Sequence, residues 1–262
     1  MVTLVAPEDR SPIQHTECFH LVFLRLLGDR LGRAVWAVKG GVNLRAWFRS
    51  RRYSEDLDID VIRVQPHALE ERVDRLLASR SLADLLSVQK LELARTAKPK
   101  QTDTTQRWKF EIRAESMALP LRTKIEFSRR ASRGEEYVLE PVLPEMVRPY
   151  GVLAPMVNHY TARAAVGQKI QALGLRSVTQ ARDVWDLDHL FRTQDPDPRP
   201  VPAHVRKALP EAYERVTSLP YAVFKSQVVP FLMPEDQETY GTAEAWKGMC
   251  DLVATRLIEL SE

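Results

Sequence analysis

Three acidic residues at alternating positions, Asp56, Asp58 and Asp60, form the densest group of side chains able to do chemistry in this sequence. Asp56 directly precedes residues 57–64, an apolar segment with the alternation of a β-strand, and Asp58 and Asp60 lie within it. Because residues i and i+2 of a strand project to the same side, Asp56 and Asp58 are expected to point together. Paired carboxylates suit Mg²⁺, a hard cation that also binds substrate phosphates. With two metal ions, such a pair would activate an attacking hydroxyl and stabilise leaving pyrophosphate.

Two consecutive glycines, Gly40 and Gly41, precede this strand and follow residues 34–38, a short apolar run typical of a buried strand. Glycines let backbone N–H groups approach a phosphate closely, and the helix predicted over residues 42–50 would add a favourable dipole. Taken singly, a Gly-Gly pair is more often a simple turn, and D-x-D is a frequent surface pattern. Their order (strand, Gly-Gly, helix, strand, D-x-D) favours a functional site.

The elements that must position these residues divide the chain in two. In the first part, periodicity predicts helices over 13–31 and 67–88 and strands over 89–97, 107–114, 121–127 and 136–139, the first two strands forming a hairpin. After the prolines between residues 141 and 155, strand patterns vanish and helices are predicted over 158–174, 180–193, 203–216, 221–229 and 242–260. We therefore expect an α+β domain with a mixed sheet over residues 1–150 and a mainly helical domain over 151–262.

Composition excludes several classes of protein. A net charge of +3 excludes a histone-like binder and an acidic disordered tail, although 28 Arg against 10 Lys hints at phosphate chemistry or at a G+C-rich genome. Cys18 and Cys250 lie too far apart for a CxxC site, which fits a reducing cytosol. No apolar run reaches the ~18–20 residues of a membrane span, so a cytoplasmic protein without membrane contact is expected. Neither a P-loop nor a histidine zinc spacing is present, and the five tryptophans are expected in the core.

The ordered motifs resemble a family of nucleotidyltransferases, the AbiEii/AbiGii toxins, which includes the MenT toxins. The family's first motif is (K)GG, a helix, then R-x-S-x-D-L-D, and it is matched by Lys39, Gly40, Gly41, Arg52, Ser54, Asp56, Leu57 and Asp58. Its helical motif E-K-L-x-A-L-x-x-R is matched by Lys169, Ala172, Leu173 and Arg176, with Gln168 in place of the commoner Glu. Arg182, Asp183, Asp186 and Leu187 match R-D-x-x-D-L. The resemblance covers about residues 20–190.

The resemblance implies roles for individual residues. Asp56 and Asp58 would hold the metal and act in catalysis. Glu126, on the strand predicted over 121–127, would supply a third carboxylate. The alternative is that Glu126 and Lys124 are an exposed pair on an edge strand. The nucleotide would be bound by Lys39, Gly40, Gly41, Ser54 and Lys169. Asp183 would act near the reacting groups, as a base or by orienting Lys169, whereas the residue types alone favour ordinary salt bridges.

The resemblance also implies a function. The protein would be an Mg²⁺-dependent toxin of a toxin–antitoxin pair that binds an NTP between its two domains and transfers NMP to RNA. The acceptor would be the tRNA 3′ end, so that translation is inhibited, and a cognate antitoxin would be its partner. Ser54 could be a site of inactivating phosphorylation, because a phosphate there would repel the Asp56/Asp58 site. Two alternatives are transfer to a protein hydroxyl and a catalytically silent nucleic-acid-binding module.

Arginines near the predicted acidic strand fit an acceptor with a phosphate backbone. They form two clusters, Arg45, Arg49, Arg51 and Arg52, and Arg129, Arg130 and Arg133. Solvated surface charge is the alternative explanation.

Overall fold

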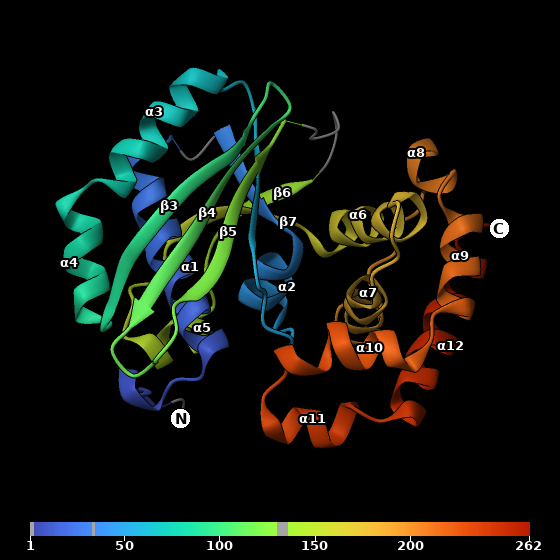
Figure 1. The fold of residues 1–262 in the computed structure, drawn as a ribbon. Helices are drawn as coiled ribbons and strands as arrows, with labels where there is room; N and C mark the ends of the chain where they lie inside the picture. The colour runs from blue at the N-terminus through green and yellow to red at the C-terminus, as the bar shows by residue number, and fades with distance from the viewer. Residues whose placement is uncertain (1–2, 33–34, 130–135) are drawn as a thin grey trace. The chain divides into compact units, whose positions relative to one another are not determined.

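The computed structural model describes residues 3–32, 35–129 and 136–262 (Figure 1). Ala34, Arg130 and Arg133, which belong to a predicted strand and a predicted basic cluster, lie outside these residues. The chain forms two compact units, one of residues 1–47 and 53–160, the other of residues 48–52 and 161–262. Among the described residues, no helix is long and apolar enough to cross a membrane.

A seven-stranded mixed sheet forms the centre of the first unit. Its strands are β1 (Trp36–Lys39), β2 (Leu57–Val61), β3 (Leu91–Gln101), β4 (Thr105–Ala114), β5 (Leu121–Ser128), β6 (Tyr137–Pro141) and β7 (Met156–Tyr160). The strand order is β3-β4-β5-β2-β1-β7-β6, with parallel pairs β2/β5 and β1/β7 and antiparallel pairs elsewhere. The predicted α+β class and the β3/β4 hairpin are confirmed.

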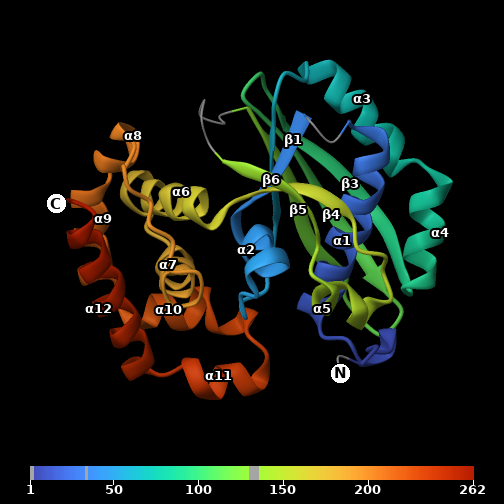
Figure 2. The same ribbon diagram turned by 180° about the vertical axis from the view of Figure 1, so that it is seen from behind.

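Helices cover one face of strands β3–β5. The elements of this unit are η1 (Pro7–Asp9), α1 (Pro12–Arg30), α2 (Gly40–Phe48), α3 (Pro66–Leu77), α4 (Arg80–Val88), α5 (Pro144–Val147) and η3 (Arg148–Tyr150). Helix α1 lies behind β3–β5 in Figure 1 and in front of them in Figure 2, and no helix of the described part of this unit lies on the opposite face of these strands. The apolar face of α1 and the buried rings of Trp108 and Phe110 on β4 form the core between the two layers.

Two sequence predictions in this unit are wrong. The single helix expected over 67–88 is interrupted after Leu77, where Ser79 starts a new helix and its hydroxyl accepts a hydrogen bond from the Leu82 N–H at 3.3 Å. A helix is predicted from residue 158, with no strand after the prolines, whereas β7 pairs with β1 inside the sheet. The prolines are typical of a domain boundary. Strand β7 is also difficult to predict, because its five residues include Asn158 and His159 and lack apolar alternation.

The second unit is helical. It contains α6 (Ala162–Leu175), α7 (Ala181–Thr193), α8 (Ala203–Arg206), α9 (Leu209–Ser218), α10 (Tyr221–Gln227), η4 (Val229–Phe231), α11 (Pro234–Tyr240) and α12 (Ala243–Glu259). The helix expected over 203–216 is thus two helices, and α11 was not predicted. Stacked aromatic rings hold the unit together, with Phe224 4.6 Å from Trp246 and 6.2 Å from Trp185 between ring centroids. All five tryptophans are buried, as predicted.

Candidate active site

Strand β2 aligns the predicted site residues of the first unit. Leu57 and Ile59 are buried on one face of the sheet, so Asp58 projects from the other. In register, Asp58 is paired with Lys39 on β1 and with Glu126 on β5. Two predicted carboxylates and the predicted nucleotide-binding lysine therefore form a row across three adjacent strands. Glu126 is not on an edge strand, because β5 lies between β2 and β4.

Gly40 makes room for the Asp58 carboxylate. Helix α2 begins at Gly40, which has φ +70°, and a Cβ atom there would lie 3.0 Å from Asp58 Oδ2. Both the left-handed backbone and the close approach require glycine. The Gly40 turn was predicted to lie against a phosphate. In the structure, the carboxylate of Asp58, a predicted metal ligand, lies against this turn at the start of α2.

Two of the acidic residues are bound to cations and one is not. Asp56 forms an ion pair with Lys124, and the Arg107 Nε donates to Glu126 Oε2 at 2.7 Å. Asp58 has no ion pair with any residue in the described part of the chain. Burial, together with the negative charges of Asp56 and Glu126, raises the pKa of Asp58 above its ordinary value, against the opposing effect of nearby lysines. The charge balance at Asp58 would therefore be improved by a bound cation.

Asp60 is the third acidic residue of the alternating series, and its carboxylate has two partners in the structure. Its carboxylate is buried, with Oδ1 2.5 Å from Lys39 Nζ and Oδ2 accepting a hydrogen bond from the Tyr160 hydroxyl at 2.8 Å. A charged and a neutral donor thus fix both oxygens. Asp60 holds Lys39 in place beside Gly40, and only the pairing of β2 with β1 makes this contact possible.

The residues fit a metal ion that arrives with its substrate. No group of three or more His, Cys, Asp or Glu side chains is arranged as a metal site in the described ranges. Mg²⁺, however, keeps several waters and is commonly bound by one or two carboxylates together with substrate phosphates. Asp56 and Asp58 supply such a pair of oxygen donors, with Glu126 beside Asp58 in register.

Hydrogen bonds to the backbone fix the segment that leads into β2. The Ser54 hydroxyl donates to the Asp56 carbonyl at 2.7 Å, and the Thr123 hydroxyl donates to the Glu55 carbonyl at 2.7 Å. Since Thr123 uses its only proton there, its oxygen must accept from His20 Nε2, 2.8 Å away. Burial lowers the pKa of His20 to about 3, which keeps the ring neutral. Helix α1 therefore supports the backbone next to Asp56.

Lys169 and Asp183, predicted from the helical motifs, meet in the second unit. Lys169 Nζ on α6 lies 3.0 Å from Asp183 Oδ1 and 2.5 Å from Asp186 Oδ2 on α7. Arg176 Nη1 lies 3.2 Å from the other oxygen of Asp183, and Arg52 binds both oxygens of Asp186 at 3.1 Å. Both aspartates are fully buried. The five side chains form one network of three cations and two anions, in which both aspartates are buried and Arg176 is partly exposed.

Asp186 carries a role that sequence analysis missed, although it occupies a motif position. Burial alone would raise its pKa, but the charges of Arg52 and Lys169 outweigh this effect and hold the pKa below its ordinary value. Asp186 therefore stays ionised and joins the Arg of the first motif to the Lys of the helical motif. Arg52 and Asp186 both occupy positions of family motifs, which marks them as candidates. Because 134 residues separate them, the sequence does not show that they form an ion pair.

The expected basic cluster near β2 is not a free surface. Arg45 donates to Glu17 at 2.8 Å and stacks on the ring of Tyr53, 3.9 Å from its centroid. Arg51 donates to Asp236 at 2.6 Å, and Arg52 belongs to the buried network. These arginines are structural partners of carboxylates, which leaves other cations to consider for an acceptor.

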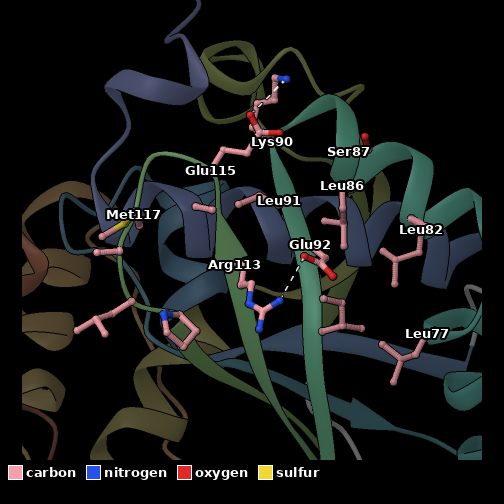
Figure 3. A pocket seen from close by; sticks show the side chains of 16 residues that line it. Leu77, Leu82, Leu86, Ser87, Lys90, Leu91, Glu92, Arg113, Glu115 and Met117 are labelled. Atoms are coloured by element: carbon pink, nitrogen blue, oxygen red, sulfur yellow. Dashed lines mark ion pairs between the residues drawn. The ribbon is translucent and has the colours of Figure 1, made fainter.

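A pocket of about 590 Å³ lies away from the predicted residues. It is formed by α4, β3 and β4, and Leu82, Leu86 and Leu91 line it (Figure 3). Ion pairs at its rim join Lys90 to Glu115 and Arg113 to Glu92. Its lining contains none of the residues with a predicted role, so we do not assign the active site to it.

Comparisons with known proteins agree with the motifs. A family model described as "Nucleotidyl transferase AbiEii toxin, Type IV TA system" matches residues 22–252. No curated protein matches significantly. Among solved structures, JHP933 from Helicobacter pylori superposes with a TM-score of 0.61 at 19% identity over 96% of both chains. A second H. pylori protein, described as a candidate nucleotidyltransferase, gives 0.58 at 18% identity over 94% of this chain and 96% of that one. At these identities the likeness establishes the fold.

Proposed function

Because the chain belongs to the AbiEii family of nucleotidyltransferase toxins of type IV toxin–antitoxin systems, we propose that it transfers NMP from an NTP to RNA, at the 3′ end of tRNA. Mg²⁺ would be its cofactor and a cognate antitoxin its partner. The observation that carries the proposal is the row of Lys39, Asp58 and Glu126 across the sheet, with Asp56 on the same strand segment and Gly40 against Asp58. Nucleotide addition at that end would block aminoacylation and hence translation.

In the proposed reaction, an acceptor hydroxyl oxygen attacks the α-phosphorus of the NTP. A new P–O bond forms, the bond to the β-phosphate bridging oxygen breaks, pyrophosphate leaves, and the hydroxyl proton passes to solvent or buffer. Bound Mg²⁺ would neutralise charge on the phosphates and on the attacking oxygen. Asp56 and Asp58 would hold the cation through their carboxylates. Lys39, oriented by Asp60, donates to phosphate oxygens from the neighbouring strand.

Asp183 acts as a positioning residue rather than a base in this account. A general base needs access to the proton that it removes. Asp183 is fully buried, and its two oxygens face Lys169 and Arg176. We therefore propose that Asp183 and Asp186 together orient Lys169 and set its charge environment. The expected contact of Lys169 with nucleotide phosphates remains a prediction.

The toxin assignment extends to regulation at Ser54. This hydroxyl caps the turn into β2 by donating to the Asp56 carbonyl. Phosphorylation would remove that hydrogen bond and add about −1.5 to −2 charges two residues from Asp56. We propose that a modified Ser54 repels the NTP. Expression of wild type, Ser54→Ala and Ser54→Asp chains, with growth as the readout, tests this. Growth arrest by Ser54→Asp as strong as that by wild type would contradict it.

The acceptor is tested by incubating the protein with each labelled NTP, Mg²⁺, and either total tRNA or total protein. Asp56→Asn serves as the matched control, because it keeps the side-chain shape and removes one negative charge. Label on tRNA with wild type alone supports the proposal. Label on protein would instead support a protein hydroxyl as acceptor. Transfer to neither, with RNA binding unchanged in Asp56→Asn, would indicate a silent nucleic-acid-binding module.

A further inference from the structure

The face of strands β3–β5 opposite α1 carries a row of cations. On β4, Trp108 and Phe110 are buried toward the helices, so the intervening Arg107 and Lys109 project from the other face. Arg95 on β3 and Arg122 and Lys124 on β5 project with them, because directly paired residues of antiparallel strands share a face. We call Arg95, Arg107, Lys109, Arg122 and Lys124 the basic sheet face.

Strand register places one pair of like charges directly opposite each other on this face, and it places one carboxylate between two arginines. Lys109 is paired directly with Lys124, and Glu111 is flanked by Arg95 on one side and Arg122 on the other. Like charges at directly opposed positions destabilise a sheet. The arrangement therefore weakens the fold at this point, and a bound anion would relieve the repulsion.

Ion pairs account for only part of the positive charge. Lys124 is bound to Asp56, Arg107 to Glu126, and Arg122 lies 3.6 Å from Glu111. No carboxylate of the described residues lies within 4.0 Å of the charged groups of Arg95 or Lys109. A cation bound by Asp56 and Glu126 would also compete with Lys124 and Arg107, and the face would then become more positive.

A pocket of about 480 Å³ joins this face to the candidate active site. Arg95, Lys109 and Lys124 line it, and Asp56 contributes to the same lining. A phosphate chain lying on the basic sheet face would therefore lead to a predicted metal-binding carboxylate. Phe110 is buried and all tryptophans are buried, so these rings offer no exposed platform for base stacking in the described structure. The recognition chemistry is that of phosphates rather than bases.

We propose that the basic sheet face binds the phosphate backbone of the RNA acceptor, with Arg95 and Lys109 as its unpaired contacts. This inference rests on the proposed function and adds the surface that the acceptor occupies. Binding would depend little on sequence and strongly on salt, with the slope of log K against log salt changing by about 0.7 for each phosphate contact to a single strand.

The test measures binding of 5′-labelled deacylated tRNA by fluorescence anisotropy over a salt series. Loss of two contacts is expected to weaken binding roughly 25-fold at 0.1 M salt and to reduce the salt slope by about 1.4. The variant is Arg95→Glu/Lys109→Glu. The control is Arg72→Glu/Arg80→Glu, which changes net charge equally at exposed positions of α3 and α4. NTP affinity, measured separately, is expected to stay within about twofold in both variants.

Three results would overturn the inference. Arg95→Glu/Lys109→Glu could bind tRNA as tightly as wild type, Arg72→Glu/Arg80→Glu could weaken binding equally, or the wild type could fail to bind tRNA. A face variant that loses NTP affinity in parallel would also overturn it, because the surface would then serve the nucleotide triphosphate. Failure of the proposed function gives a different result. The wild type would bind tRNA through this face and yet transfer no labelled NMP to it.

Discussion

At the residue scale, two of the carboxylates that a metal ion would bind form ion pairs with lysine and arginine side chains. Lys124 is bound to Asp56 and Arg107 to Glu126, whereas Asp58 has neither as an ion-pair partner. These cations balance the negative charge of the two carboxylates, and a metal ion would have to compete with them. The affinity for a metal ion would therefore depend on residues that are not themselves ligands.

Replacing Lys124 by Met is expected to tighten binding of Mn²⁺ alone about fivefold, because a competing positive charge beside Asp56 is removed. A fivefold change corresponds to about 1 kcal/mol of binding free energy, a magnitude suited to a partly exposed ion pair. Titration followed by electron paramagnetic resonance measures the free Mn²⁺. Lys109→Met removes a nearby charge that has no ion pair among the described residues and should change affinity less. Weaker binding in Lys124→Met would show that Lys124 positions Asp56 rather than competing for it.

His20 gives the fold a dependence on pH. Its pKa is about 3 in the folded protein against an ordinary value near 6.5, so the unfolded chain takes up a proton first as pH falls. This contribution is complete above pH 6.5 and is lost progressively down to about pH 3, by about 2 kcal/mol at pH 5. Urea unfolding at pH 7 and pH 5 should show a larger loss in wild type than in His20→Gln. Equal losses would contradict a buried neutral histidine.

At the element scale, contacts between neighbouring elements position the candidate residues within each unit. The β1–α2 turn places Gly40 against Asp58, and the α6–α7 pair surrounds Lys169 with two aspartates. Period-two alternation was enough to predict β2, β4 and β5, whereas only the family resemblance implied that Glu126 lies beside Asp58. Alternation could not reveal which strands are neighbours, which is why β7 and the contact of Asp60 with Lys39 emerged only from the fold.

Gly40→Ala should destabilise the protein by about 1–2 kcal/mol, because alanine is strained at positive φ and its Cβ would press on the Asp58 carboxylate. Nucleotidyl transfer should fall much further than stability alone explains. Gly28→Ala in α1 is the control. A Cβ there meets nothing within 4 Å, and the change should stabilise by about 0.5–1 kcal/mol. Urea unfolding measures the stability of both variants, and the transfer assay measures their activity. Full activity in Gly40→Ala would contradict the prediction.

Asp186→Asn should cost about 3–5 kcal/mol of unfolding free energy, because Arg52 and Lys169 would lose a buried counter-charge. Asp251→Asn offers a matched comparison in the same unit, since its ion pair with Lys247 is exposed and should contribute less than about 1 kcal/mol. Chemical denaturation distinguishes them. Similar small losses in both variants would mean that the network is not needed for stability.

At the scale of the whole molecule, the family match spans both compact units, and each contains some of the predicted residues. The net charge of +3 gave no sign of the basic sheet face, because 35 acidic residues offset most of the 38 basic ones in the sum. Hydrophobic periodicity along the chain predicted the α+β fold, and the roles of the candidate residues remain predictions. Partners far apart in sequence, such as Arg52 and Asp186, leave no local periodicity and could not be paired without the structure.

The most direct test of the account follows the position of the phosphorus label. Wild type and Asp58→Asn are incubated with tRNA, Mg²⁺ and the same NTP labelled either at the α- or at the γ-phosphate. The account predicts that wild type places α-label on the tRNA 3′ end and releases γ-label as pyrophosphate, and that Asp58→Asn loses at least about two orders of magnitude of this transfer. Transfer of γ-label to the acceptor, or undiminished α-transfer by Asp58→Asn, would contradict it.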